Sequence, residues 1–255
     1  MTGILKPFYI TVLFTFISLQ AYSQPDFAFI QNDWISSVNK GESFQQLLFP
    51  KGYLLYFNGN PTFSSQENPV DDFGIDGELA DYQQIKQFEH DQFRFLTLAD
   101  VSLDQKVCSL LTGWRKTETK WSKEIDILLA QTSDSNVSDS AKQQLNNERK
   151  EWIEFANRHD PAEHIRTSYT KDAVYFSNGM RSDGHSGITE RYAYMKNPNY
   201  QVDLEVAYLR QTSDTQIIEV GRYFTGKVHR GSGGIYVILW QKQAEDWQIG
   251  MDFNF

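Results

Sequence analysis

Hydrophobic and polar positions in the last forty residues of the chain follow the pattern of an antiparallel β meander. Three apolar runs rich in β-branched and aromatic residues lie between Gln216 and Phe255, and turn-forming clusters at Gly231–Gly234 and Ala244–Asp246 separate them. Such runs, bounded by such clusters, are typical of strands joined by hairpins. The last run, WQIGMDFNF, reaches Phe255, so we expect the end of the chain to be held in a sheet.

The pattern ahead of this meander predicts two helices, a strand, a short helix and another strand. Apolar residues at helical spacing follow Ser140, a possible capping residue, and continue to about Arg158. The stretch Asp160–Glu163 then marks a second helix, because Asp caps helices and Pro fits their first turn. The remaining elements are expected at Asp172–Gly179, Ile188–Met195 and Val202–Gln211.

The first half of the chain shows a similar order of elements. Apolar positions at helical spacing run from Asp26 to Phe49 with a break at Lys40-Gly41, which predicts a long helix and a short one. The polar stretch Ser64–Gly77 has no helical period and is expected to be a loop. Apolar runs predict strands at Gly52–Phe63, Phe93–Ser102, Lys106–Thr117 and Glu124–Gln131.

The two halves resemble each other in sequence. Tyr53–Asn60 matches Ala173–Met180, and Ala99–Thr117 matches Ala207–Lys227 in its order of strand, polar turn and strand. A break rich in Ser, Asp and Asn follows Thr132. The pattern predicts a tandem repeat of an α+β unit of about 110 residues, a usual domain size. We expect the first copy to be degenerate, with no counterpart of the closing WQIGMDFNF strand.

The second half resembles the SnoaL-like branch of the nuclear transport factor 2-like superfamily, to which ketosteroid isomerase also belongs. The residues that carry this resemblance are Asp172, Asn178, Gly179, Gly234, Tyr236, Trp240, Trp247, Ile249 and Asp252. The resemblance implies a cone, in which a curved sheet wraps around helices and leaves a cavity at its open end. Family members include isomerases, cyclases, dehydratases, ligand binders and dimerisation modules, so the resemblance implies a fold and no particular reaction.

These observations predict an α+β protein made of two tandem cone-shaped domains. Each is expected to have a curved antiparallel sheet around about three helices. The expected divisions are a signal peptide over 1–23, a degenerate domain over 24–132, a linker over 133–140 and a second domain over 141–255.

Composition excludes some classes of partner and chemistry. The formal charge of −9 argues against a nucleic acid, because binding to phosphates needs an excess of Lys and Arg. The five histidines lack the spacings typical of metal sites, so no metal and no cofactor is expected. Cys108 is the only cysteine and cannot form an internal disulfide. It is expected to be a small buried residue.

Residues 1–23 have the pattern of an export signal. Lys6 supplies a positive start, Phe8 to Leu19 is apolar, and Ala21-Tyr22-Ser23 fits a cleavage site. The apolar stretch is short for a membrane span, although a retained anchor is the alternative interpretation. We therefore expect an exported protein, periplasmic or secreted, that begins near Gln24 and has no stable membrane insertion after cleavage.

Asp252 is an obvious candidate for a catalytic carboxylate, because it lies within an aromatic strand. An isomerase of the implied family needs a carboxyl group in an apolar cavity, where burial raises its pKa. Alternation along the strand places Asp252 on the face opposite Ile249, Met251 and Phe253. Without a bulge in the strand, Asp252 would face away from the apolar interior.

Arg222 and His229 are further candidates for the cavity. Arg222 shares a strand face with Ile218 and Val220, so its guanidinium could hold a ligand carboxylate there. The alternative is an Arg at the rim or paired with a buried Glu. His229 could shuttle protons, or it could be an exposed turn residue.

Aromatic residues provide the other candidates for a ligand-binding wall. They are Tyr175, Tyr192, Tyr236 and Trp240, whose rings offer apolar surface with hydrogen-bonding tips. About half of them are expected to be ordinary core or interface residues instead.

The sequence favours a protein that binds a small, partly apolar molecule in its second domain without turnover. The alternatives are an isomerase, dehydratase or cyclase that uses Arg222, Tyr175 or Asp252, and a structural module. In the structural module, the sheet face that carries Tyr236, Ile238 and Trp240 would pack against the twin domain or a second chain, which would allow a homodimer.

Overall fold

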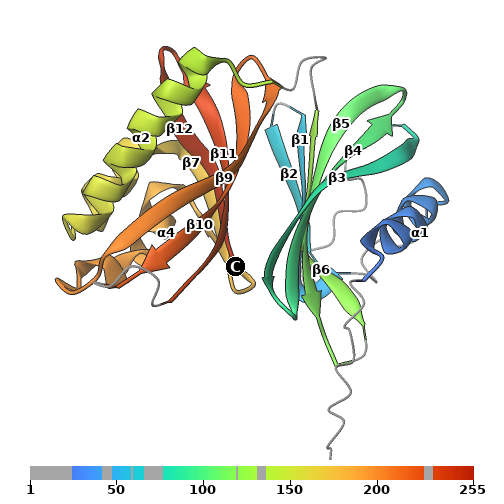
Figure 1. The fold of residues 1–255 in the computed structure, drawn as a ribbon, viewed down its shortest axis with the longest axis horizontal. Helices are drawn as coiled ribbons and strands as arrows, with labels where there is room; N and C mark the ends of the chain where they lie inside the picture. Colours follow the sequence, from blue (N-terminus) through green and yellow to red (C-terminus); the bar gives the residue numbers. More distant parts are fainter. Residues whose placement is uncertain are drawn as a thin grey trace, which may run out of the picture.

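The computed structural model describes residues 25–41, 48–58, 60–65, 77–118, 120–130, 136–226 and 232–255. They form two α+β units that stand side by side, with the two sheets in the middle and the helices on the outside (Figure 1). The predicted fold class and the tandem arrangement are therefore confirmed. Among the described residues, no helix combines the length and apolar character needed to cross a membrane.

The first unit contains one described helix and a six-stranded sheet with strand order β2-β1-β6-β5-β4-β3. Its elements are α1 (Phe27–Asn39), β1 (Leu48–Asn58), β2 (Asn60–Ser65), β3 (Leu79–Asp91), β4 (Arg94–Leu103), β5 (Lys106–Lys116) and β6 (Trp121–Ala130). The short helix expected after Lys40 falls largely on residues 42–47, outside the described residues. The predicted strand Gly52–Phe63 is contained in the hairpin of β1 and β2.

The second unit has the same strand arrangement, β8-β7-β12-β11-β10-β9, and its helices cover one face of the sheet. Its helices are α2 (Asp139–Asn157), α3 (Pro161–Ser168), α4 (Gly184–Arg191) and the short 3-10 helix η2 (Ala193–Lys196). Its strands are β7 (Tyr169–Ser177), β8 (Met180–Asp183), β9 (Val202–Ser213), β10 (Gln216–Thr225), β11 (Ser232–Gln243) and β12 (Asp246–Asn254). β6 occupies in the first sheet the place of β12 in the second. The closing strand therefore has a counterpart, contrary to expectation.

Neighbouring strands pair antiparallel except at one place in each sheet. β1 pairs parallel with β6, and β7 pairs parallel with β12, because each unit brings its last strand back beside its first. The sheets are thus mixed, with one parallel pair inside an otherwise antiparallel arrangement.

Helix starts follow the expected capping chemistry, with one shift. The Asp160 carboxylate accepts a hydrogen bond of 3.1 Å from the Glu163 amide, with Pro161 in the first turn of α3. α2 is capped by Ser138 and not by Ser140, since the Ser138 hydroxyl accepts from the Ala141 amide at 3.2 Å.

The two units share details of side-chain bonding. At the end of α1, the Asn39 side chain bonds the backbone N and O of Leu79 at 3.0 and 2.7 Å. At the end of α2, the Asn157 side chain bonds the backbone N and O of Val202 at 2.9 and 3.0 Å. Each clamp ties a helix end to the start of the edge strand, β3 or β9. The units are therefore repeats in bonding as well as in topology.

A β-bulge also recurs in the last strand of each unit. The β5–β6 register shifts between Gly113 and Trp114, and the β11–β12 register shifts between Leu239 and Trp240. A bulge inserts one residue into one strand, so the residues beyond it exchange faces relative to the residues before it. Asp126 in β6 and Asp252 in β12 lie the same number of residues after the bulge of their own strand.

In the first unit this carboxylate is paired internally. Asp126 accepts hydrogen bonds from the Lys123 ammonium at 2.6 Å and from the Thr112 hydroxyl at 2.5 Å. Lys123 is fully buried, with its ammonium 3.4 Å from the centre of the Trp34 ring. Burial lowers the pKa of Lys123 to about 8, although the charge and hydrogen bond of Asp126 oppose that shift. The buried charge of Asp126 is thus compensated within the unit.

The apolar core has three layers. The sheets pack face to face through a shared layer that includes Leu111, Phe176 and Val237, while other clusters lie between each sheet and its own helices. Consequently each sheet is covered on both faces by parts of this chain.

The face of β11 that packs against the twin unit differs from the expected one. Ile235, Val237 and Leu239 belong to the layer between the sheets. Tyr236, Ile238 and Trp240 point instead toward the helices of the second unit. The sheet face that was considered for pairing is therefore covered by the second unit's own helices, and the opposite face packs against the first unit.

We expect Phe176→Ala to destabilise both units together. Phe176 is buried between the sheets, with its ring centre 5.0 Å from that of Tyr53. Removing such a ring costs about 3 kcal/mol in free energy of unfolding. Urea unfolding measures the loss, with Phe29→Ala as the control because Phe29 is 72% exposed. Equal stability of the two variants would contradict the shared core.

Candidate functional site

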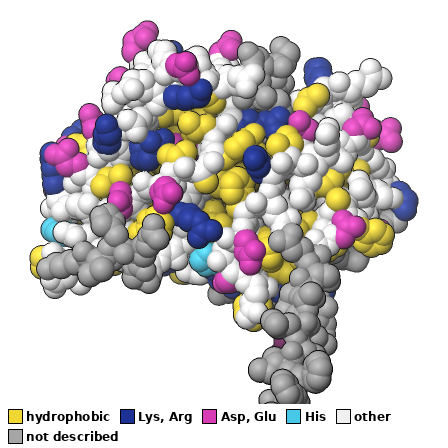
Figure 2. Space-filling model, in the orientation of Figure 1, with side chains coloured by type: hydrophobic (Ala, Val, Ile, Leu, Met, Phe, Trp, Pro, Cys, Tyr) yellow, Lys and Arg dark blue, Asp and Glu magenta, His cyan; other side chains and the backbone are white. Residues whose placement is uncertain are grey.

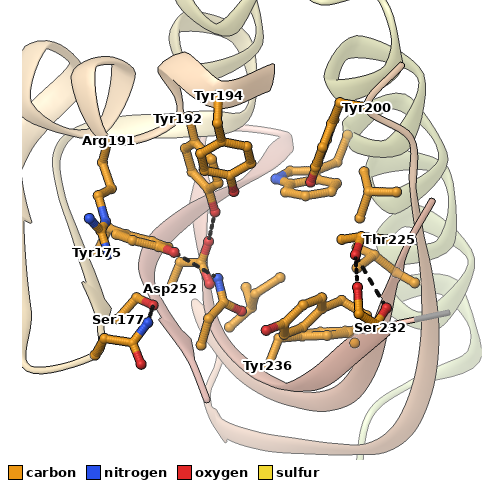
Figure 3. Close-up of a pocket in the computed structure, with 18 residues that line it drawn as sticks. Tyr175, Ser177, Arg191, Tyr192, Tyr194, Tyr200, Thr225, Ser232, Tyr236 and Asp252 are labelled. Carbon is orange, nitrogen blue, oxygen red and sulfur yellow. Dashed lines mark hydrogen bonds between the residues drawn. The ribbon is translucent and has the colours of Figure 1, made fainter. Parts of the chain in front are cut away.

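A pocket of about 520 Å³ opens into the second unit between the sheet and the segment that contains α4 and η2. Six tyrosines contribute to its wall, and Figure 3 shows five of them around the hollow. The six are Tyr175, Tyr192, Tyr194, Tyr200, Tyr223 and Tyr236. They come from β7, the segment after α4, β10 and β11. We call this hollow the tyrosine-lined pocket.

Asp252 lies at the wall of this pocket, because the bulge in β12 turns it there. Trp240 pairs with Ile249 and Leu239 pairs with Met251, so Gly250 is the extra residue of the bulge. Ile249 therefore faces the helices, Met251 faces the other sheet, and Asp252 faces the pocket. The expectation from unbroken alternation, which turned Asp252 away from the unit's interior, is wrong for this reason.

The Asp252 carboxylate is held by two tyrosine hydroxyls. Tyr169 and Tyr192 both donate to Oδ2 of Asp252 at 2.7 Å, and the Tyr192 bond is visible in Figure 3. The side chain of Tyr169 is additionally tied to Trp152, whose indole N–H donates to the Tyr169 hydroxyl at 3.2 Å. Because every member of the group is buried, the position of the carboxylate is fixed from several sides.

Burial determines the acidity of this group. It raises the pKa of Asp252 to about 6, while the hydrogen bonds from Tyr192 and Tyr169 act in the opposite direction. The pKa values of Tyr169 and Tyr192 are raised, mainly by burial and next by the charge of Asp252. Near neutral pH the site therefore contains a carboxylate with a pKa close to the ambient pH, beside two neutral phenols.

A second buried carboxylate anchors the inner part of the unit. Glu219 accepts two bonds of 2.8 Å from the Arg149 guanidinium, one of 2.7 Å from Tyr236 and one of 2.9 Å from the Trp240 indole. A buried ion pair is tolerated when hydrogen bonds satisfy its remaining capacity, as they do here. The network connects α2 to β10 and β11, and it fixes the ring of Tyr236 in the pocket wall.

The remaining aromatic candidates fall into two positions. Tyr175 lines the pocket, and its hydroxyl accepts a 3.3 Å bond from the Asn254 amide. Trp240 lies behind the wall, where its ring belongs to the core and its N–H is bonded to Glu219. Tyr194 and Tyr200, which the sequence did not single out, stack edge to face at 5.2 Å beside the opening.

Arg222 does not enter the tyrosine-lined pocket. Its strand face is shared with Ile218 and Val220, as expected, but that face is directed at the other sheet. The Arg222 guanidinium is exposed and donates to the Glu89 carbonyl of the first unit at 3.2 Å. His229 lies outside the described residues.

Two features of the site escaped the sequence interpretation. Tyr169 begins β7, where no local pattern distinguishes it from a core residue. Gly250 interrupts an apolar strand, and an isolated glycine in a strand is a known sign of a bulge. Gly250 was therefore the signal that could have placed Asp252. Within the described ranges, no group of three His, Cys, Asp or Glu side chains is arranged to hold a metal ion.

The chain resembles several proteins of known structure. No protein-family model and no curated protein matches it. It is similar to the solved structure of a nuclear transport factor 2-like protein of unknown function from Shewanella oneidensis MR-1, at 18% identity and a TM-score of 0.40. That match covers 44% of this chain and 97% of the other.

Two further solved structures show a similar extent of likeness. A nuclear transport factor 2-like protein of unknown function from Pseudomonas putida KT2440 is 16% identical over 47% of this chain and 88% of the other, with a TM-score of 0.39. A ketosteroid isomerase-like protein from Erwinia carotovora atroseptica SCRI1043 is 16% identical over 46% of this chain and 96% of the other, with a TM-score of 0.37.

We expect Asp252 to make stability depend on pH. Its pKa is about 6 when folded and about 3.9 when unfolded, so the folded state binds the proton more tightly. The contribution of Asp252 to the free energy of unfolding is therefore largest below pH 4. It falls by about 2–3 kcal/mol as the pH rises toward 6.

Asp252→Asn should remove that part of the pH dependence, because the amide does not ionise in this range. Urea unfolding at pH 4.5 and pH 7.5 compares the variant with the unaltered protein. An identical change in stability for both proteins would show that Asp252 is not the group responsible.

Proposed function

We propose that the second unit binds a small, partly apolar molecule in the tyrosine-lined pocket, and that binding without turnover is its main function. The observation that carries this proposal is a cavity of about 520 Å³ to whose wall six tyrosines contribute. Pockets that enclose small molecules usually have volumes of about 300–1,000 Å³ and apolar or aromatic walls with a few polar groups.

The wall also indicates the character of the ligand. Tyrosine rings favour a flat, unsaturated body, and their hydroxyls can bond a few oxygen or nitrogen atoms at its edge. Among the lining residues that the structure describes, the charged side chains are Asp252 and Arg191. These features support a ligand with a largely uncharged ring system and polar substituents.

We further propose that the protein is exported. The support is the sequence of residues 1–23, with a basic start, an apolar stretch and small residues at the expected cleavage point. An exported binder would meet its ligand outside the cytoplasm.

A neutral fluorescent probe tests the binding proposal. Dansylglycine amide combines a flat aromatic body with polar atoms, and we expect its fluorescence to rise on binding as it leaves water. Ser232→Trp should weaken binding about tenfold or more, because Ser232 lines the opening and an indole there would fill part of it. Fluorescence titration measures the dissociation constants.

Ser140→Trp is the matched control for this substitution. Ser140 is exposed in the first turn of α2 and does not line the pocket, so its replacement should leave the affinity unchanged. Equal affinities for both variants would place the probe elsewhere and contradict the proposal.

A second candidate function is proton transfer by Asp252. It is favoured by one observation, a buried carboxylate with a pKa of about 6 that faces a cavity and has two phenols beside it. A general base works best when its pKa is near the ambient pH and when it is positioned. This candidate corresponds to isomerase, dehydratase or cyclase chemistry, in which a carbon-bound proton is removed.

The compound 5-nitrobenzisoxazole tests whether Asp252 can act as a base. A base takes its ring C–H proton, the electron pair forms the nitrile, and the N–O bond breaks to release a coloured phenolate. If Asp252 is the base, the rate rises with pH through about 6 and falls at least a hundredfold in Asp252→Asn. Asp214→Asn, an exposed turn carboxylate, is the control. Equal rates in both variants would exclude Asp252 as the base.

A further inference from the structure

The two units differ at the residue that accompanies their equivalent carboxylates, Asp126 and Asp252. In the first unit, Lys123 lies three residues before Asp126 in β6, and its ammonium bonds that carboxylate at 2.6 Å. In the second unit, Ile249 occupies the place of Lys123 in β12, just before the bulge. The carboxylate of the second unit therefore lacks the cation that the first unit supplies to its own.

The aromatic surroundings of this cation are repeated in the second unit. The Lys123 ammonium lies 3.4 Å from the centre of the Trp34 ring on α1. Trp34 lies five residues before the clamp residue Asn39, and Trp152 of α2 lies five residues before the clamp residue Asn157. Trp152 lines the tyrosine-lined pocket. The aromatic side of the cation's place is thus present in both units.

No other cation among the described residues compensates Asp252. In that part of the chain no Lys, Arg or His forms an ion pair with it. Arg191 lines the same pocket, but its guanidinium donates to the Met180 sulfur. His164 packs on Trp152 with ring centres 4.7 Å apart, and burial lowers its pKa to about 3, so its ring is neutral near pH 7.

The Asp252 carboxylate also has one oxygen available to a ligand. The hydroxyls of Tyr169 and Tyr192 both donate to Oδ2, and no described residue donates to Oδ1. Because Asp252 lines the pocket, Oδ1 can accept a bond from a molecule inside it. The two phenols bring hydrogen bonds and no positive charge. A buried carboxylate without a cation is costly, so a cation that enters the pocket gains a strong interaction there.

We propose that the ligand of the tyrosine-lined pocket carries an ammonium group that binds to the Asp252 carboxylate. This inference rests on the proposed binding function and narrows it to small aromatic or polycyclic amines. The ammonium takes in the second unit the part that Lys123 has in the first. The tyrosine rings add to the attraction, because the face of an aromatic ring is negative and favours cations.

The charge of the whole molecule favours the approach of a cation. The chain has 33 Asp and Glu residues against 24 Lys and Arg residues, which gives a formal charge of −9. In Figure 2, acidic side chains are spread over both units on the face shown. A negative field of this kind raises the local concentration of cations and speeds their association.

Dansylethylenediamine and dansylglycine amide test the ammonium site. Both carry the dansyl ring system on a two-carbon chain, which ends in an ammonium in the first and in a neutral amide in the second. At pH 7.5 Asp252 is ionised, since its pKa is about 6. We expect the ammonium probe to bind about tenfold more tightly than the amide, because hydrogen bonds between charged groups are the stronger ones. Fluorescence titration measures both dissociation constants.

Asp252→Asn should bring the ratio of the two affinities close to one, because the side-chain amide carries no charge. Asp214→Asn is the matched control. It removes the same charge from an exposed turn, so the ratio should stay at that of the unaltered protein.

A second pair of variants tests the comparison with the first unit. Ile249→Lys introduces an ammonium where the first unit has one, so the preference for the ammonium probe should disappear. Ile249→Met has a side chain of similar length without a charge and should keep the preference. Melting temperatures show which variants remain folded, and Asp252→Asn decides if Ile249→Lys does not fold.

The outcomes separate this inference from the proposed function. If neither probe binds, or if Ser232→Trp weakens neither, the proposed function itself is contradicted. If both probes bind with equal affinity and Ser232→Trp weakens both, the binding function stands and the ammonium site is overturned. A preference that persists in Asp252→Asn, or that is lost equally in Asp214→Asn, also overturns it.

Discussion

The apolar contact between the two sheets is the constraint on which the other features of this structure depend. Each sheet has one face toward its own helices and the other against the twin unit, so the two sheets support each other across the shared apolar layer. That rigid backing holds β10, β11 and β12 as one curved wall. The positions of the pocket residues on the helix side of these strands, including Tyr236 and Asp252, depend on this backing. The same contact brings β3 of the first unit to Arg222.

Much of the fold could be predicted from the sequence, because the relevant signals are local. Asp160-Pro161 marked the start of α3, and the turn clusters marked the hairpins of the closing meander. β3 was not predicted, since as an edge strand it has a largely polar run, with Tyr82, Ile85 and Phe88 only partly buried. An edge strand packs on fewer neighbours and so has a weaker apolar pattern.

The candidate site was harder to predict because it depends on how strands and units meet. Tyr175 and Tyr192 were predicted from their aromatic character and line the pocket. Asp252 was placed on the wrong face by counting alternate residues, since one extra residue at Gly250 reverses every position beyond it. Arg222 was placed on the correct strand face, but nothing within one unit revealed that this face meets another sheet. Contacts between distant segments leave no periodic signal in the sequence.

The paired carboxylates at Asp126 and Asp252 suggest how the two copies diverged in use. In one copy the acid is neutralised from within by Lys123, and in the other it is left to tyrosines beside an open cavity. An acid that is neutralised from within needs no molecule from outside and no entrance, so such a copy can act as a scaffold. The first unit can then serve as a supporting half, while the second keeps an open cavity beside its acid.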